Sequence, residues 1–80
     1  MMMMICYSRE GCDPCGPWID NLRVVERKYR IPLRVIYVSP ASSIRTPTTV
    51  LVDDDGEIMG TWIGAGPRYL GEMETMVREM

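Results

Sequence analysis

The sequence predicts an α/β fold with one four-stranded mixed sheet and two helices. Three patterns lead to this prediction: short apolar runs typical of buried strands, two stretches with helical apolar spacing, and an Asp-Asp-Gly turn signal between two β-rich runs. The predicted elements follow the order strand, helix, strand, strand, strand, helix. A chain of 80 residues is expected to form a single domain, residues 1–80, with a thin core.

The first half of the chain predicts a strand, a helix and a second strand. Met2 to Ser8 is an apolar run short enough for a buried strand, and Leu33 to Val38 is rich in β-branched and aromatic residues. Apolar residues recur at helical spacing over 14–30, where Asp13 suits the N-cap and Pro14 the first helical position. Because a helix connects these two strands, we expect them to be parallel.

The second half predicts a hairpin followed by a helix. Thr48 to Asp53 and Glu57 to Ile63 flank the turn Asp54-Asp55-Gly56, so these two strands should pair antiparallel. Ser39 to Thr46 is predicted to form a polar loop between the second strand and this hairpin. Pro67 opens the last helix, and its predicted apolar face consists of Leu70, Met73, Val77 and Met80.

Composition narrows the possible functions. Nine basic and eleven acidic residues give a net charge of -2 with no basic stripe, so no nucleic-acid partner is expected. The apolar start, Met1 to Ile5, is too short for a signal or membrane span, and we expect a cytoplasmic protein without membrane contact. Histidine is absent from the sequence, which excludes Cys-His nucleophilic catalysis and zinc sites with histidine ligands.

Cys12-Asp13-Pro14-Cys15, at the first strand-to-helix junction, is the motif that carries chemistry. Two thiols at this spacing can exchange with a disulfide, or they can supply half of a zinc site. Unpaired N–H groups and the helix dipole favour a thiolate just before the helix, so Cys12 is the expected nucleophile. Cys15, one turn further and more buried, is the expected resolving thiol.

Asp13 and Pro14 are expected to tune this exchange. An ionised Asp13 would repel the Cys12 thiolate, raise the pKa of Cys12 and favour the disulfide, which predicts a reductant with a potential near about -270 mV. Asp13 could instead serve only as an N-cap, and Pro14 favours a helix that starts there. Cys6 is expected to be a small core residue, with a third redox thiol as the alternative.

Further segments accompany the cysteine motif: Tyr7 to Cys12, Thr46-Pro47-Thr48, Asp55-Gly56, and Gly64-Ala65 followed by Pro67-Arg68-Tyr69-Leu70. Together with the element order, they resemble the thioredoxin and glutaredoxin superfamily along nearly the whole chain. Trp62-x-Gly64-x-x-Pro67 also resembles the glutaredoxin-like hydrogen donors of ribonucleotide reductase. The resemblance therefore implies a minimal thioredoxin fold that lacks the usual helix between the second and third strands.

The same resemblance implies a thiol-disulfide oxidoreductase that uses a redox-active Cys12–Cys15 disulfide and no other cofactor. It implies a cis peptide bond before Pro47 and a Thr46 backbone that binds substrate by strand addition. Gly64, Ala65 and Gly66 would form the opposite lip of the substrate groove, with a plain flexible loop as the alternative. Protein disulfides are the implied substrates, with ribonucleotide reductase as one candidate. A thioredoxin reductase is the implied electron donor, because Gly64-Ala65-Gly66-Pro67 replaces the segment that glutaredoxins use for glutathione.

Several alternatives stay open at this point. Cys12 and Cys15, with Cys6 or a second chain, could hold zinc or an iron-sulfur cluster, and a glutathione-dependent glutaredoxin is a further possibility. Arg9 either offsets the charge of Asp13 or is solvated. Trp18 and Trp62 either line the site or pack in the core. Without the missing helix one sheet face is uncovered, so Trp62, the methionines or a partner could cover it, and we expect a monomer or weak dimer.

Overall fold

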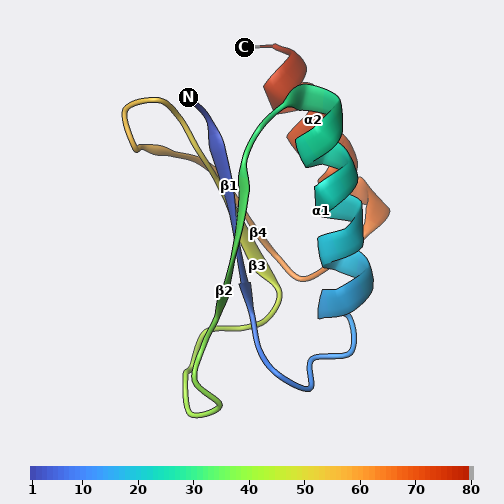
Figure 1. Cartoon of the computed structure of the whole chain (residues 1–80), viewed down its shortest axis with the longest axis vertical. Helices are drawn as coiled ribbons and strands as arrows, with labels where there is room; N and C mark the ends of the chain where they lie inside the picture. The colour runs from blue at the N-terminus through green and yellow to red at the C-terminus, as the bar shows by residue number, and fades with distance from the viewer. Residues whose placement is uncertain (80) are drawn as a thin grey trace.

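The structure is a computed structural model that describes residues 1–79. Its elements follow the predicted order, namely β1 (Met3–Ser8), α1 (Cys15–Tyr29), β2 (Leu33–Tyr37), β3 (Thr48–Val52), β4 (Ile58–Ile63) and α2 (Pro67–Arg78). The strands form one sheet in the order β2-β1-β3-β4 (Figure 1). Strand β1 is parallel to β2 and antiparallel to β3, which is antiparallel to β4. The predicted α/β class, mixed sheet and helix-free β2–β3 connection are confirmed.

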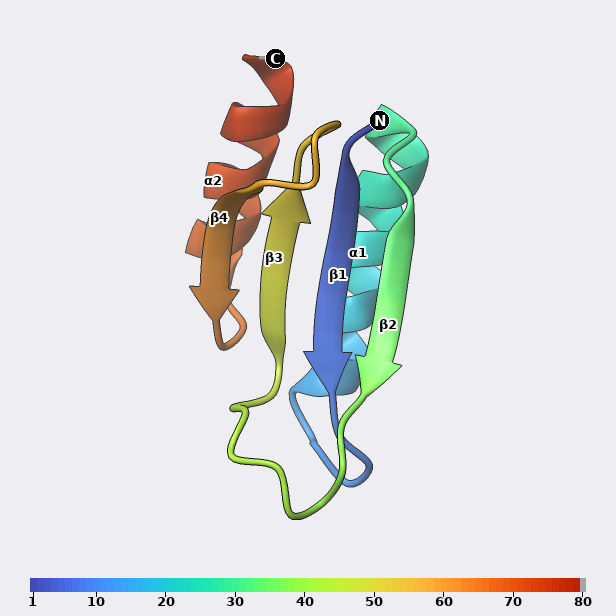
Figure 2. The same cartoon turned by 90° about the vertical axis from the view of Figure 1, so that its left-hand side faces the viewer.

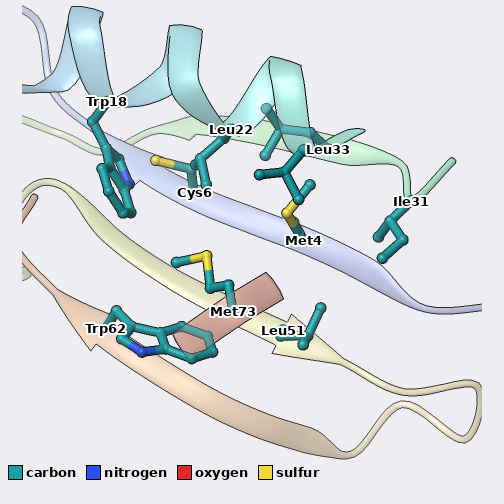
Figure 3. Packing of buried hydrophobic residues seen from close by; sticks show 10 residues of the cluster. Met4, Cys6, Trp18, Leu22, Ile31, Leu33, Leu51, Trp62 and Met73 are labelled. Carbon is teal, nitrogen blue, oxygen red and sulfur yellow. The ribbon is translucent and has the colours of Figure 1, made fainter. Parts of the chain in front are cut away.

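Both helices lie on the same face of the sheet, as Figures 1 and 2 show. The core fills the space between the helices and the sheet (Figure 3). Alternating residues of β1 point into it, and α1 contributes side chains spaced three or four apart, which is the helical repeat. The core residues are Met4, Cys6, Trp18, Leu22, Val25, Ile31, Leu33, Leu51, Trp62 and Met73. None of the helices within residues 1–79 has the length and apolar character needed to cross a bilayer.

The predicted helix faces are largely correct. In α1, Trp18, Leu22 and Val25 are buried, whereas Tyr29 is half-buried at the C-terminal end. In α2, Met73 is fully buried, and Leu70 and Val77 are partly buried against the same core. Met80, the last residue of the predicted face, lies outside the described residues.

The start of α1 differs from the prediction. The helix begins at Cys15, Pro14 occupies the cap position, and no side chain caps the N-terminus. The reason is local, since the Cys15 N–H donates to the Cys12 carbonyl at 3.2 Å and closes a turn across the motif. Asp13 lies exposed within that turn, and it is therefore not the N-cap.

The sheet face opposite the helices is uncovered. Trp62 does not compensate for the missing helix, because its side chain is 5% exposed and packs in the core on the helix-covered face. The residues that alternate with the core-facing ones along each strand point away from the helices. Three isoleucines among them are more than a third exposed. These three residues are Ile36, Ile58 and Ile63.

The hairpin turn between β3 and β4 is built around Asp53. Its Oδ1 atom accepts the N–H groups of Asp55 at 2.9 Å and Glu57 at 3.0 Å, and Gly56 has a φ of 86° that favours glycine. The register then shifts between Leu51 and Val52, so both strands are shorter than predicted at the turn end. On β4, the Gly60 backbone lies beneath the Trp62 ring.

A Gly60→Ala substitution should lower the free energy of unfolding by about 1–3 kcal/mol, because the core must shift to admit the methyl group. A Cβ atom at this position would lie 2.6 Å from the Trp62 Cη2 atom. The measurement is urea unfolding followed by tryptophan fluorescence. Gly71→Ala in α2 is the matched control: its Cβ would meet nothing within 4 Å. This control should stabilise the protein by about 0.5–1 kcal/mol. Equal stabilities of Gly60→Ala and the wild type would contradict the prediction.

Candidate redox site

Three connections meet at one end of the molecule, where β1, β2 and β4 end and β3 begins (Figure 2). The first connection carries the cysteine motif, the second carries Thr46 and Pro47, and the third carries Gly64 and Ala65. Binding sites in open α/β sheets commonly lie at the carboxyl ends of the parallel strands. The topology therefore brings the sequence-predicted site residues to the same end of the sheet.

Cys12 and Cys15 form a disulfide, with their Cα atoms 5.4 Å apart. Cys15 is the first residue of α1 and is only 3% exposed, because it lies on the same helix face as Trp18. Cys12 precedes the helix and is half-buried, while Asp13 and Pro14 are exposed. Cys12 is thus the more exposed residue of the pair.

The N-terminus of α1 can stabilise negative charge on Cys12. No side chain caps it, and its first turn contains no acidic residue. The helix dipole at such an end favours a nearby thiolate.

The second connection presents a backbone segment with open hydrogen-bonding groups. The Thr46–Pro47 peptide bond is cis, which is the isomer expected from the sequence, and Pro47 is buried. The Pro47 carbonyl accepts the Gly64 N–H at 2.8 Å, so the second and third connections are joined directly. Gly64 has a φ of 104°, which disfavours other residues there. The backbone groups of the half-buried Thr46 bond to no other residue in 1–79.

A shallow, mainly apolar groove of about 310 Å³ lies beside the cysteine motif. One wall is the first turn of α1, with Pro14, Pro17 and Trp18, and the other runs from Ala65 to Pro67. Ala65 therefore lines a surface next to the cysteine motif, and its role in binding substrate stays a prediction.

Trp18 packs the first turn of α1 against β3 and α2. Its indole N–H donates to the Thr49 Oγ1 atom of β3 at 2.9 Å, and its ring packs edge-on against Tyr69 with centroids 6.5 Å apart. Sequence reasoning missed Thr49, although a hydroxyl at an inward position of an apolar strand was the available signal. Trp18 and Trp62 are 1% and 5% exposed, so both are packing residues, and Trp18 also contributes to the groove wall.

Cys6 is fully buried among the core side chains (Figure 3). Its Cα in β1 pairs with that of Thr49 in β3. Burial raises the pKa of the Cys6 thiol above its usual value, although a hydrogen bond from the Thr49 hydroxyl opposes the shift. Cys6 is a core residue, as predicted. Within the described part of the chain, no group of three or more Cys, Asp, Glu or His side chains is arranged to hold a metal ion.

Arg9 has a different role from the two considered for it. Its Nη2 atom donates to the Ser42 carbonyl at 2.7 Å and to the Ile44 carbonyl at 2.9 Å. Arg9 is neither paired with Asp13 nor simply solvated, because the half-buried side chain spans from the cysteine loop to the β2–β3 connection. No pattern in the sequence indicates this contact between residues far apart in the chain.

Solved structures share this architecture. A thioredoxin from Fasciola hepatica superposes with a TM-score of 0.78 at 18% identity, covering 94% of this chain and 79% of its own. A thio-disulfide isomerase from Thermus thermophilus gives 0.75 at 16% identity over 94% and 77% of the two chains. A periplasmic thioredoxin from Paracoccus pantotrophus gives 0.67 at 18% identity over 96% and 95%.

These likenesses identify the chain as a protein with the thioredoxin fold, and its Cys12–Cys15 pair lies at the junction of β1 and α1. No protein-family model matches the sequence, and no curated protein matches it.

The raised pKa of Cys6 predicts a pH dependence of stability. The folded protein holds the thiol proton more tightly than the unfolded chain, so the free energy of unfolding should fall as pH rises above about 8.5. The measurement is denaturant unfolding of the disulfide form between about pH 7 and pH 9.5. Cys6→Ala should lose this part of the pH dependence, whereas identical profiles for the two proteins would exclude it.

Proposed function

We propose that the protein is a thiol-disulfide oxidoreductase that reduces disulfides in other proteins. One observation carries this proposal: a disulfide joins a more accessible Cys12 to a buried Cys15 at an uncapped helix N-terminus. The thioredoxin fold around the pair supports the same function. The disulfide is then the redox centre, and the protein needs no other cofactor for the reaction.

The reaction follows from the different exposure of the two cysteines. In the reduced protein, the Cys12 thiolate attacks one sulfur of a substrate disulfide and releases the other as a thiolate. Cys15 then loses its proton, attacks the Cys12 sulfur and releases the second substrate thiolate. The substrate gains two electrons from the protein, one proton from Cys15 and one from water, and the protein returns to the Cys12–Cys15 disulfide.

The substrate that fits this end of the molecule is an extended polypeptide. The backbone groups of Thr46 have no partner among residues 1–79, so a substrate strand can pair with them. The groove bordered by Ala65 and the first turn of α1 can take an apolar side chain of the same substrate. Thr46, Pro47, Gly64 and Ala65 are the substrate-binding residues in this proposal.

We further propose the physiological setting. A thioredoxin reductase is the electron donor, and ribonucleotide reductase is one candidate acceptor because of Trp62-x-Gly64-x-x-Pro67. The protein acts in the cytoplasm as a monomer or weak dimer, without nucleic acid or membrane.

Insulin reduction tests the proposed activity. The wild-type protein should turn over with a thioredoxin reductase and NADPH, and much more slowly with glutathione. Cys12→Ser should abolish turnover, whereas Cys15→Ser should accumulate a mixed disulfide between Cys12 and the substrate that mass spectrometry detects. Cys6→Ala is the control and should keep its activity.

Two results would contradict the proposal. In one, the Cys15→Ser protein forms no adduct at Cys12 although Cys12 still reacts with iodoacetamide. In the other, freshly purified protein contains stoichiometric zinc or iron, which would favour a metal-binding module instead.

Asp13 should lower the reduction potential of the Cys12–Cys15 pair. Its exposed carboxylate lies next to the nucleophile, destabilises the thiolate and so lowers the potential, which we expect near about -270 mV. Asp13→Asn should raise the potential by no more than about 30 mV, because water and salt screen an exposed charge. Equilibration with a dithiothreitol redox buffer measures it, with Asp20→Asn as the charge-matched control. A wild-type potential near about -120 mV would refute the expectation.

A further inference from the structure

The β2–β3 connection has no helix or strand, yet it carries the substrate-binding segment of the proposed function. Most of its own hydrogen bonds are short-range. The Ala41 N–H donates to Ser39 Oγ, and the Ile44 N–H donates to Ser42 Oγ, both at 3.2 Å. Such turns shape a loop, but they do not fix its position relative to the cysteines.

The Arg9 side chain connects this loop to the segment that carries the cysteines. A single guanidinium nitrogen binds the carbonyls of Ser42 and Ile44, at 2.7 and 2.9 Å. Within residues 1–79, no other side chain from outside this connection and β3 donates to residues 39–45. Hydrogen bonds from a charged donor are stronger than neutral ones, so this contact can hold the connection in place.

The same residue contacts the cysteine turn through its backbone. The Arg9 carbonyl accepts the Cys12 N–H at 3.2 Å. Its side chain then reaches the connection that leads into Thr46 and Pro47, and Pro47 in turn binds Gly64. Arg9 thus joins the nucleophile's turn to both loops of the proposed substrate site.

The surroundings of the guanidinium support a fixed role. Its Nε atom is buried without a partner, and Arg9 forms no ion pair in the described residues. A solvated surface arginine would instead keep all its N–H groups in water. The side chain is therefore committed to the two carbonyls.

We propose that Arg9 is a positioning residue that holds Thr46 at a fixed place relative to Cys12, so that extended peptide disulfides bind in line for attack. The inference rests on the proposed function and deepens it. It separates two classes of substrate: peptides that pair with Thr46 depend on Arg9, whereas small disulfides that touch only the sulfur of Cys12 do not.

The test compares three variants on two substrates, insulin and the small aromatic disulfide DTNB. Arg9→Met keeps an aliphatic stem but lacks the donors, Arg9→Lys keeps the charge, and Arg27→Met, exposed near the far end of α1, is the charge-matched control. For Arg9→Met, kcat/KM with insulin should fall about tenfold, mainly through KM, while the DTNB rate stays within about twofold. Arg9→Lys should recover part of the loss, and Arg27→Met should match the wild type.

Two patterns would overturn the inference. An equal loss with both substrates, in step with a smaller folded fraction by circular dichroism, would make Arg9 a residue of stability alone. A changed DTNB rate with a shifted pH profile would mean that its charge acts on the Cys12 thiolate.

A second measurement does not depend on catalysis. Amide hydrogen exchange of residues 42–46 should be faster in Arg9→Met than in Arg27→Met. If the wild type reduces neither substrate, the proposed function fails, and exchange still decides whether Arg9 positions the connection. Unchanged exchange would refute the positioning role even in an active protein.

Discussion

The burial of Trp18 holds the first turn of α1 on the sheet, and the different exposure of the two cysteines depends on this contact. The indole N–H of Trp18 bonds to Thr49 in β3, while its ring meets Tyr69 in α2, so one side chain joins three elements. Cys15 lies on the same helix face and is drawn inward with it, whereas Cys12 stays in the preceding turn. A loosely held helix end would leave both cysteines similarly exposed, and the basis for the proposed order of attack and resolution would be lost.

The fold was largely predictable from the sequence because its determinants are local. The apolar repeat of 14–30 specified the first helix, and the turn signal around Gly56 specified the antiparallel pairing of β3 with β4, without any tertiary information. The predicted start of α1 was wrong by one residue, because the turn between Cys12 and Cys15 competes with capping by Asp13. Propensities describe single positions, and they do not include such a competition.

The cysteine motif was equally visible in the sequence, but the residues that hold the neighbouring elements in place were not. Cys12 and Cys15 lie only three positions apart in the chain, and this spacing carries the signal. Thr49 and Arg9 act instead through bonds to residues more than thirty positions away. A single sequence does not reveal such contacts, because a threonine in a strand or an arginine in a loop has many ordinary uses.

The uncovered sheet face has a consequence for the colloidal behaviour of the protein. Ile36, Ile58 and Ile63 present apolar surface on a molecule whose net charge is only -2 at neutral pH. Electrostatic repulsion between copies is therefore weak, and it vanishes as the carboxylates take up protons under mildly acidic conditions. Solubility, more than folding stability, should then limit the concentration at which the molecules remain separate.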